Sequence, residues 1–197
     1  MHHNPVPSVV LAAALSACAV QPEQLNSERI EQRFGNYGIE VIEQNSSVRR
    51  SNLYSADGAV RTCRTYAVVV FSDSDTKAIG GAHSGVLAGE SIGATFKTAG
   101  WRIEKETFFV GELQITNPQH LIAQLMHLDA PTSLGLHAYR LVLGKELDSI
   151  HYATIIEAHH PDYLVEADLF ELYSPTPELR PEADEIAALQ RLVLSIN

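Results

Sequence analysis

The chain has 197 residues and a formal net charge of −10, with 24 acidic residues against 14 basic ones. Because no cluster of Lys or Arg interrupts this acidic balance, nucleic acid and anionic lipid headgroups are excluded as expected partners. The two cysteines, Cys18 and Cys63, are too few for a disulfide framework. The length suits one domain with a sizeable core, and nothing in the sequence indicates a cofactor.

A short apolar run, from Val9 to Cys18, stands near the start of the chain. An apolar run of about ten residues is half as long as a membrane-spanning helix needs, so it is typical of the hydrophobic part of an export signal. Leu15-Ser16-Ala17-Cys18 resembles the lipobox of bacterial lipoproteins. The resemblance implies a signal peptide over residues 1–17, and acylation of Cys18 as the membrane anchor. Ala19 stands where lipoproteins of the inner membrane commonly carry Asp, which implies an outer-membrane protein facing the periplasm.

A helix and an antiparallel meander are the first elements predicted after this signal. A polar tether over residues 18–25 leads to a helix over residues 26–35, in which Asn26 or Ser27 is the cap and Gly35 the end. Asp57-Gly58 is a two-residue hairpin signal, and it separates two runs of alternating residues. The predicted strands of the meander cover residues 39–43, 48–55 and 60–71.

Cys63 lies in the third of these strands. Simple alternation places it on one face with Ala67, Val69 and Phe71. The second half of the strand is apolar on both sides, which indicates a central position in the sheet. We therefore expect Cys63 to be buried and unreactive.

Glycine is concentrated in one segment, where six of the twelve glycines fall between residues 80 and 100. A helix is predicted from a cap at residues 72–76 to Leu87. Gly85, Gly89 and Gly93 recur every four residues, which on a helix gives a smooth stripe for close packing. The alternative is a ligand-binding loop. Its candidate residues are Gly89, Ser91, Gly93 and the aromatic Trp101.

The second half of the chain predicts a further strand, a hairpin and three helices. In chain order they are a strand over 102–113, a helix over 117–128, hairpin strands over 136–143 and 150–158, a helix from Pro161, and a helix after a Pro-containing linker at 174–177. The last helix carries an apolar stripe and is expected to dock on the domain or on a partner protein of the envelope. The stripe consists of Ile186, Leu189, Leu192, Val193 and Ile196.

These elements predict an α+β fold. Strands grouped as hairpins, with helices between the groups, indicate a mainly antiparallel sheet of about five to six strands, with helices on one face and the amphipathic C-terminal helix in addition. The expected division is a single domain over residues 26–173, followed by the linker and helix over 174–197. Strands that begin at Tyr66 and Tyr152 resemble each other, which hints at two related halves.

The residues that best suggest chemistry are His137, Glu157 and His159. If the second hairpin pairs symmetrically about its loop, His137 lies opposite Glu157, and His159 shares their face. Two imidazoles and a carboxylate can bind Zn²⁺ or act as acid and base. A register slip of one residue would send His137 to the other face. Of the neighbouring residues, His160 is expected to point the opposite way, and Asp162 to be a first-turn carboxylate of a helix.

Three classes of function remain open. A lipid-anchored, non-catalytic interaction or assembly module is favoured, because the sequence has no H-E-x-x-H spacing and Cys63, in mid-strand, is badly placed for a nucleophile. A periplasmic small-ligand-binding lipoprotein is the first alternative, and it depends on the glycine-rich segment. A metal-dependent hydrolase that uses His137, Glu157 and His159 is the second.

Overall fold

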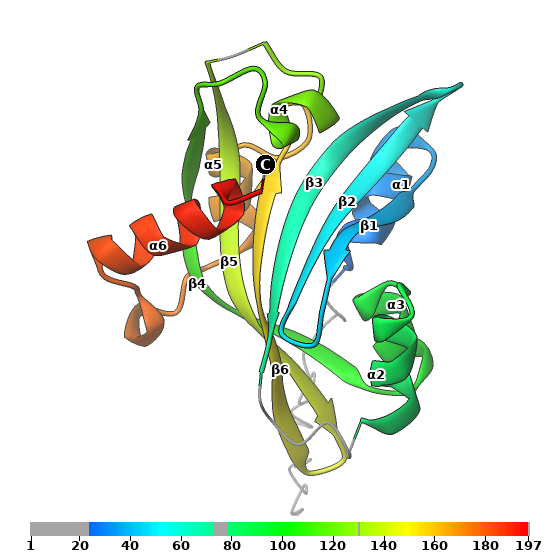
Figure 1. The fold of residues 1–197 in the computed structure, drawn as a ribbon. Coiled ribbons are helices and arrows are strands. Elements are labelled where there is room, and N and C mark those ends of the chain that lie inside the picture. The colour runs from blue at the N-terminus through cyan, green and yellow to red at the C-terminus, as the bar shows by residue number, and fades with distance from the viewer. Residues whose placement is uncertain (1–23, 73–78, 130, 197) are drawn as a thin grey trace, which may run out of the picture.

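Six strands form one antiparallel sheet, in the order β1-β2-β3-β6-β5-β4 (Figure 1). The structure is a computed structural model, and it describes residues 24–72, 79–129 and 131–196. The strands are β1 (Gly38–Gln44), β2 (Val48–Asp57), β3 (Val60–Phe71), β4 (Arg102–Ile115), β5 (Thr132–Lys145) and β6 (Asp148–His159). The α+β fold that the sequence predicted is therefore confirmed.

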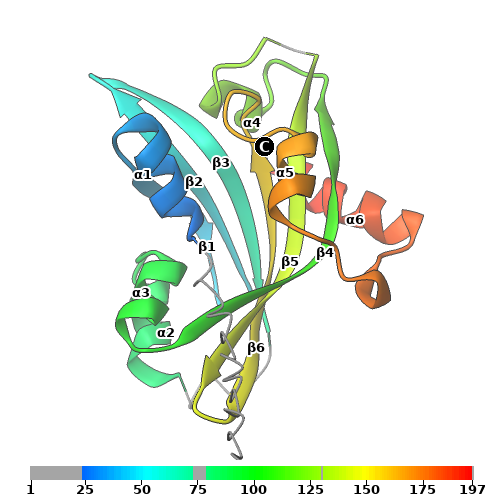
Figure 2. The same ribbon diagram turned by 180° about the vertical axis from the view of Figure 1, so that it is seen from behind.

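Helices cover both faces of this sheet (Figures 1 and 2). They are α1 (Asn26–Phe34), α2 (Gly80–Leu87), α3 (Ile92–Thr98), α4 (Leu121–Leu125), α5 (Glu166–Leu172), the short 3-10 helix η1 (Pro177–Leu179) and α6 (Ala183–Leu194). α1, α2, α3 and α5 lie against one face, and α6 crosses the other (Figures 1 and 2). α4 packs on the same side as α6, since Ile122 and Ala123 belong to the core that contains Val193, so these two helices make the sheet a middle layer.

The sheet consists of two three-stranded meanders, β1-β2-β3 and β4-β5-β6, which are joined by the pairing of β3 with β6. In the middle of this junction Val68 lies opposite Ile156. The four pairings inside the meanders each contain a register shift, in which one strand has an extra residue. The extra residues are Ile42, Arg64, Phe108 and Tyr152. The two halves suggested by the strands at Tyr66 and Tyr152 correspond to these meanders.

Cys63 is fully buried, as predicted, but it lies on the face opposite to the one predicted. Leu53 pairs with Thr65 and Tyr54 with Cys63, so Arg64 is an extra residue that reverses the alternation. Cys63 therefore packs with Tyr66 and Val68 in the core under α6. Burial raises the pKa of its thiol, which makes the thiolate scarce and the residue unreactive.

The apolar stripe of α6 packs on the sheet of its own chain. Val193 is completely buried in the core that contains Cys63, and Leu189, Leu192 and Ile196 pack against this core. Arg50 of β2 fixes the end of the helix, because its guanidinium donates hydrogen bonds to the Leu192 carbonyl oxygen (2.9 Å) and to Ser195 Oγ (2.9 Å).

Two predicted helices are shorter than expected. The helix predicted over residues 117–128 is α4, because His120 takes the N-cap position and its Nδ1 accepts a hydrogen bond from the Ile122 N–H. The helix predicted from Pro161 begins at Glu166, after a turn. Asp162 is consequently not a first-turn carboxylate of α5, which was the expectation. The predicted cap at residues 72–76 lies almost wholly outside the described residues.

Candidate functional site

The pairing of β5 with β6 places His137 directly opposite Glu157, as predicted. His159 lies two residues further along β6 and shares their face. The register is not the simple symmetric one. Near the loop Lys145 pairs with Asp148, and the extra residue Tyr152 then shifts the partner of every later residue by one position. Without this bulge His137 would lie opposite Ile156.

The three side chains converge on one oxygen of the carboxylate. Glu157 Oε2 lies 3.8 Å from His137 Nδ1 and 3.8 Å from His159 Nε2. The three side chains are buried, and one ligand atom from each lies within 4.8 Å of the others. They form the group that is best able to hold a metal ion among the residues placed in the structure.

Each of the three side chains is also held by a hydrogen bond to the atom that faces away from their common centre. Thr107 Oγ1 lies 2.9 Å from His137 Nε2, and Thr65 Oγ1 lies 2.9 Å from His159 Nδ1. Asn26, the first residue of α1, donates from Nδ2 to Glu157 Oε1 (3.1 Å) and to Thr65 Oγ1 (3.1 Å). The orientation of the triad is therefore fixed by residues of α1, β3 and β4.

Asn26 itself is held by Tyr163, whose hydroxyl group donates a hydrogen bond of 2.6 Å to Asn26 Oδ1. The sequence indicated Asn26 only as a helix cap. The N-cap is instead Leu25, and the Glu28 carboxylate accepts a hydrogen bond from its N–H (3.0 Å). Asn26 is thus free to point into the sheet, and no local sequence pattern could have revealed this function.

The buried environment sets the charges of two members of the triad. Burial lowers the pKa of His159 well below its ordinary value, so this imidazole is neutral at pH 7. Burial alone would raise the pKa of Glu157, but the adjacent His137 and the positive charge of Lys105 outweigh it and hold this pKa below its ordinary value. A neutral imidazole and an ionised carboxylate are the forms that bind metal ions.

The other polar residues near the end of β6 are directed elsewhere. His160 lies beyond the last residue of β6, and its Nε2 donates to the Met126 carbonyl oxygen (3.0 Å) while its Nδ1 accepts from the Asp162 N–H (3.0 Å). His151 is exposed and lies on the loop side of the Tyr152 bulge. Neither belongs to the triad, as expected for His160.

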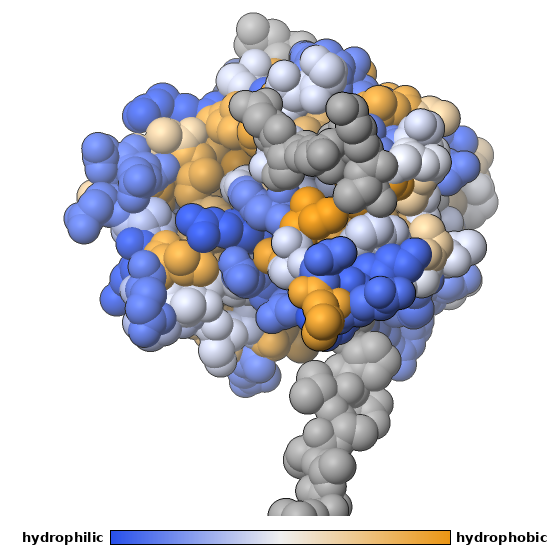
Figure 3. Space-filling view, turned by 90° about the horizontal axis from the view of Figure 1, so that it is seen from below, coloured by the Kyte–Doolittle hydropathy of each residue, from blue (hydrophilic) through white to orange (hydrophobic). Residues whose placement is uncertain are grey.

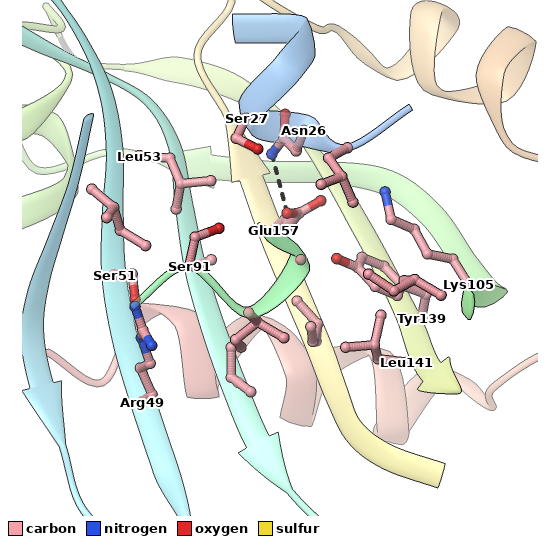
Figure 4. A pocket seen from close by; sticks show the side chains of 18 of the residues that line it. Asn26, Ser27, Arg49, Ser51, Leu53, Ser91, Lys105, Tyr139, Leu141 and Glu157 are labelled. Atoms are coloured by element: carbon pink, nitrogen blue, oxygen red, sulfur yellow. Dashed lines mark hydrogen bonds between the residues drawn. The ribbon is translucent and has the colours of Figure 1, made fainter. Parts of the chain in front are cut away.

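A cavity of about 90 Å³ lies beside the triad, between the sheet and helices α1 and α3 (Figure 4). Its lining residues are Leu25, Asn26, Ser27, Tyr37, Ile39, Arg49, Ser51, Leu53, Ala67, Val69, Ser91, Ile92, Gly93, Ile103, Lys105, Tyr139, Leu141, Ile155 and Glu157. Glu157 belongs both to the cavity and to the triad, so the two features adjoin.

Two of the four residues predicted to form a ligand loop line this cavity, namely Ser91 and Gly93. Gly89 does not. It follows the end of α2 with a φ of +101°, and its carbonyl oxygen accepts a hydrogen bond from Arg49. Trp101 does not either, and packs against Phe96 with 6.5 Å between the ring centroids. The glycines also do not form one helical stripe, since α2 ends before Gly89.

Close packing explains two of the glycines. A Cβ atom on Gly93 would lie 2.9 Å from Leu25 Cδ2, and one on Gly85 would lie 2.6 Å from Glu90 Oε2. Gly93 therefore lets α3 approach the start of α1 closely. Tight packing is thus confirmed at Gly93, whereas ligand binding by Ser91 and Gly93 stays a prediction.

Arg49 is the main feature of the cavity that the sequence did not reveal. It is buried, and its guanidinium donates hydrogen bonds to the carbonyl oxygens of Val86 (3.1 Å), Gly89 (3.3 Å) and Glu90 (2.8 Å). Within the described parts of the chain no carboxylate pairs with it. An arginine in an alternating strand gives no sign that it will be buried beneath a loop some 40 residues further along the chain.

No known protein family, curated protein or solved structure matches this chain. Among the helices described, none has the length and apolar character needed to cross a bilayer. The predicted signal peptide, Cys18 and Ala19 lie outside the described residues.

Proposed function

We propose that the chain is a lipid-anchored protein of the bacterial cell envelope that binds a small anionic molecule in the cavity between the sheet and helices α1 and α3. The observation that carries the binding function is the lining of this cavity, where apolar strand residues form the floor and two cations face it. The lipobox at Leu15-Ser16-Ala17-Cys18 supports the anchor.

The charges of the cavity favour an anion. Arg49 and Lys105 lie on opposite sides of it (Figure 4). Glu157 is the one carboxylate in the lining, and one of its oxygens is already occupied by Asn26. The lining is thus net positive in a chain whose formal charge is −10, which is the opposite of what composition alone would give. A negative charge in the cavity would complement Arg49, which has only carbonyl and hydroxyl partners.

The size of the cavity restricts the ligand. At about 90 Å³ it is far below the roughly 300–1,000 Å³ of pockets for drug-sized ligands. The floor includes Leu53, Val69 and Ile155, which suit a short hydrocarbon part. The ligand class that fits both observations is a short-chain carboxylate.

Thermal unfolding of the full chain with butyrate, butylamine or butanol tests this proposal. A ligand that binds only the folded state raises the melting temperature, so butyrate should raise it more than the other two compounds. Lys105→Gln should weaken the effect of butyrate, because it removes one cation from the lining. Lys145→Gln is the matched control, since Lys145 does not line the cavity. Equal shifts for butyrate and butylamine would contradict an anion site.

The anchor is tested separately through Cys18. Cys18→Ala should abolish incorporation of a labelled fatty acid and release the protein from the membrane fraction, because acylation requires the thiol. The measurement is metabolic labelling followed by fractionation in a Gram-negative host. Wild-type protein that is unlabelled and wholly soluble would disprove anchoring and would leave the cavity proposal unaffected.

An interaction or assembly module is the alternative. The sequence left open whether the apolar stripe of the C-terminal helix docks on the domain or on a partner, and α6 packs this stripe on its own sheet. On the face seen from below, hydrophobic residues form small separate groups among hydrophilic ones (Figure 3). A surface for a protein partner is generally a larger continuous patch. Neither the stripe of α6 nor this face therefore offers a continuous apolar surface, and the cavity lining carries the proposal of a small ligand.

A further inference from the structure

We infer that His137, Glu157 and His159 form a binding site for one divalent transition-metal ion, for which Zn²⁺ is the appropriate probe. The inference is independent of the proposed carboxylate ligand. Two imidazoles and one carboxylate are a ligand set that suits Zn²⁺, as well as Fe²⁺, Ni²⁺ and Cu²⁺. In this chain they come from two adjacent strands, so backbone pairing fixes their relative positions.

The distances are close to those of a metal site and longer than those of hydrogen bonds. Both imidazole nitrogens lie 3.8 Å from Glu157 Oε2, which is beyond hydrogen-bonding distance. With metal–ligand bonds of about 2.0–2.1 Å, the ligand atoms of a tetrahedral site lie about 3.3–3.4 Å apart. An inward movement of about half an ångström by each side chain would complete this geometry.

The atoms that face the centre are left without hydrogen bonds in two of the three residues. Glu157 Oε2 and His159 Nε2 are buried and have no hydrogen-bond partner among the described residues. Unsatisfied polar atoms in the interior are costly and call for an explanation. An ion bound between them would satisfy both.

The outer hydrogen bonds have the arrangement that metal sites require. In such sites each imidazole donates its other N–H to a fixed acceptor, and the carboxylate is held by a further donor. Thr107 and Thr65 occupy the acceptor positions for His137 and His159. Asn26 holds the second oxygen of Glu157. The ligand atoms are therefore turned toward a common point by residues that do not themselves reach it.

A purely structural function for the triad is the competing explanation. A hydroxyl group can donate as well as accept, so Thr65 could donate to His159 Nδ1 and leave the Nε2 proton directed at Glu157. Zn²⁺ binding requires the opposite arrangement, in which Nδ1 carries the proton and Nε2 has a free electron pair. The threonine permits either state, and binding measurements distinguish them.

Two cations oppose the binding of a metal ion. The charges of Lys105 and Arg29 act on His159, and both would repel a dication. Lys105 also lines the cavity, as Glu157 does, so a long flexible side chain stands at the place where an ion would enter. It follows that Lys105→Gln should strengthen metal binding, whereas the same change should weaken butyrate binding. The two proposals thus predict opposite effects of one substitution.

The experiment is a Zn²⁺ titration of the full chain, stripped of metal by a chelator, against a competing chelator dye, with the bound metal quantified by mass spectrometry. The wild type should bind one equivalent of Zn²⁺ and gain thermal stability from it. Glu157→Gln should lose this equivalent while keeping the size of the side chain. The variant retains every histidine of the chain, including His2 and His3, so the equivalent that it loses is the one that requires the Glu157 carboxylate.

Three further variants sharpen the result. His160→Ala should bind Zn²⁺ as the wild type does, because this imidazole is directed to the Met126 carbonyl oxygen. Thr65→Val should weaken binding by about 10–100-fold, the usual effect of removing an outer hydrogen bond. Lys105→Gln should strengthen it severalfold. If the wild type binds no Zn²⁺, or if Glu157→Gln and His160→Ala bind alike, the triad holds protons or water only and the inference is overturned.

Discussion

The two faces of the central strands differ in kind, although both are buried. On the side of α6, alternate residues of β5 and β6 form a continuous apolar core, which includes Leu136, Ala138, Ile156 and Ala158. On the other side the intervening positions of the same strands are His137, Glu157 and His159, which are linked to polar residues. The twofold period of a strand thus separates two environments by the thickness of one backbone.

This difference indicates how the domain can hold a polar interior. Buried polar networks contribute little net stability, because hydrogen bonds gained inside replace hydrogen bonds lost to water. The apolar face stabilises the sheet by removing hydrocarbon from water. The face of the triad also buries apolar residues, among them Val69, Tyr139 and Ile155, so the polar group is surrounded by hydrocarbon.

The sharpest test of the comparison is a truncation on the apolar face. Ile156→Ala should lower the free energy of unfolding by about 2–5 kcal/mol, because it removes three buried carbon atoms and leaves a cavity. Urea denaturation gives the value. Ile150→Ala, at a half-buried position near the hairpin loop, is the control and should cost less. Equal effects would contradict the view that complete burial in the core under α6 sets the cost of the truncation.

On the polar face Asn26→Ala should cost about 2–3 kcal/mol, since Glu157 and Tyr163 would each lose a buried hydrogen bond. The matched control is Ser27→Ala, the next residue of α1, whose hydroxyl group takes no part in this network. The same denaturation experiment measures both. If the two variants are equally stable, Asn26 does not connect α1 to the triad.

The strands and their order along the chain were predictable because their signals are local. Alternating side chains and the Asp57-Gly58 turn give the limits of β2 and β3 almost to the residue. The bulges were not predictable. The extra residue Arg64 places Cys63 on the other face of the sheet, and no property of Arg64 itself indicates a bulge. Bulges arise from the fit of one strand to its neighbour, and the neighbour is unknown until the sheet is formed.

The candidate site was predictable only in part, and the reason is the same. The triad belongs to one hairpin, so pairing about its loop predicted His137 opposite Glu157, although the Tyr152 bulge sets this register in the structure. The residues that complete it come from distant segments: Asn26 from α1, Thr65 from β3 and Thr107 from β4. Arg49 and Lys105, which give the cavity its charge, likewise belong to separate strands, β2 and β4, and come to face one cavity only in the folded sheet.

The smallest effects on stability are expected for substitutions of Cys63. They test on which face of the sheet this residue lies. Cys63→Ser should cost about 1–2 kcal/mol, because it places a hydroxyl group in the apolar core. Cys63→Ala should cost less. In the Cys18→Ala background Cys63 is the sole thiol of the chain, and it should react with a thiol reagent at the rate of unfolding. Reaction as fast as that of a free thiol would mean that α6 does not cover it.

The junction between β3 and β6 has a consequence for the order of folding. Each meander brings together strands that are close in the chain, whereas the junction pairs Val68 with Ile156, across a long loop whose closure costs entropy. The meanders should therefore form before they join. The three side chains of the triad all belong to the second meander, but Thr65 and Asn26, which orient two of them, belong to the first half of the chain. A folding intermediate with separate halves would hold the three groups without the alignment, and the site would be completed only in the last kinetic step.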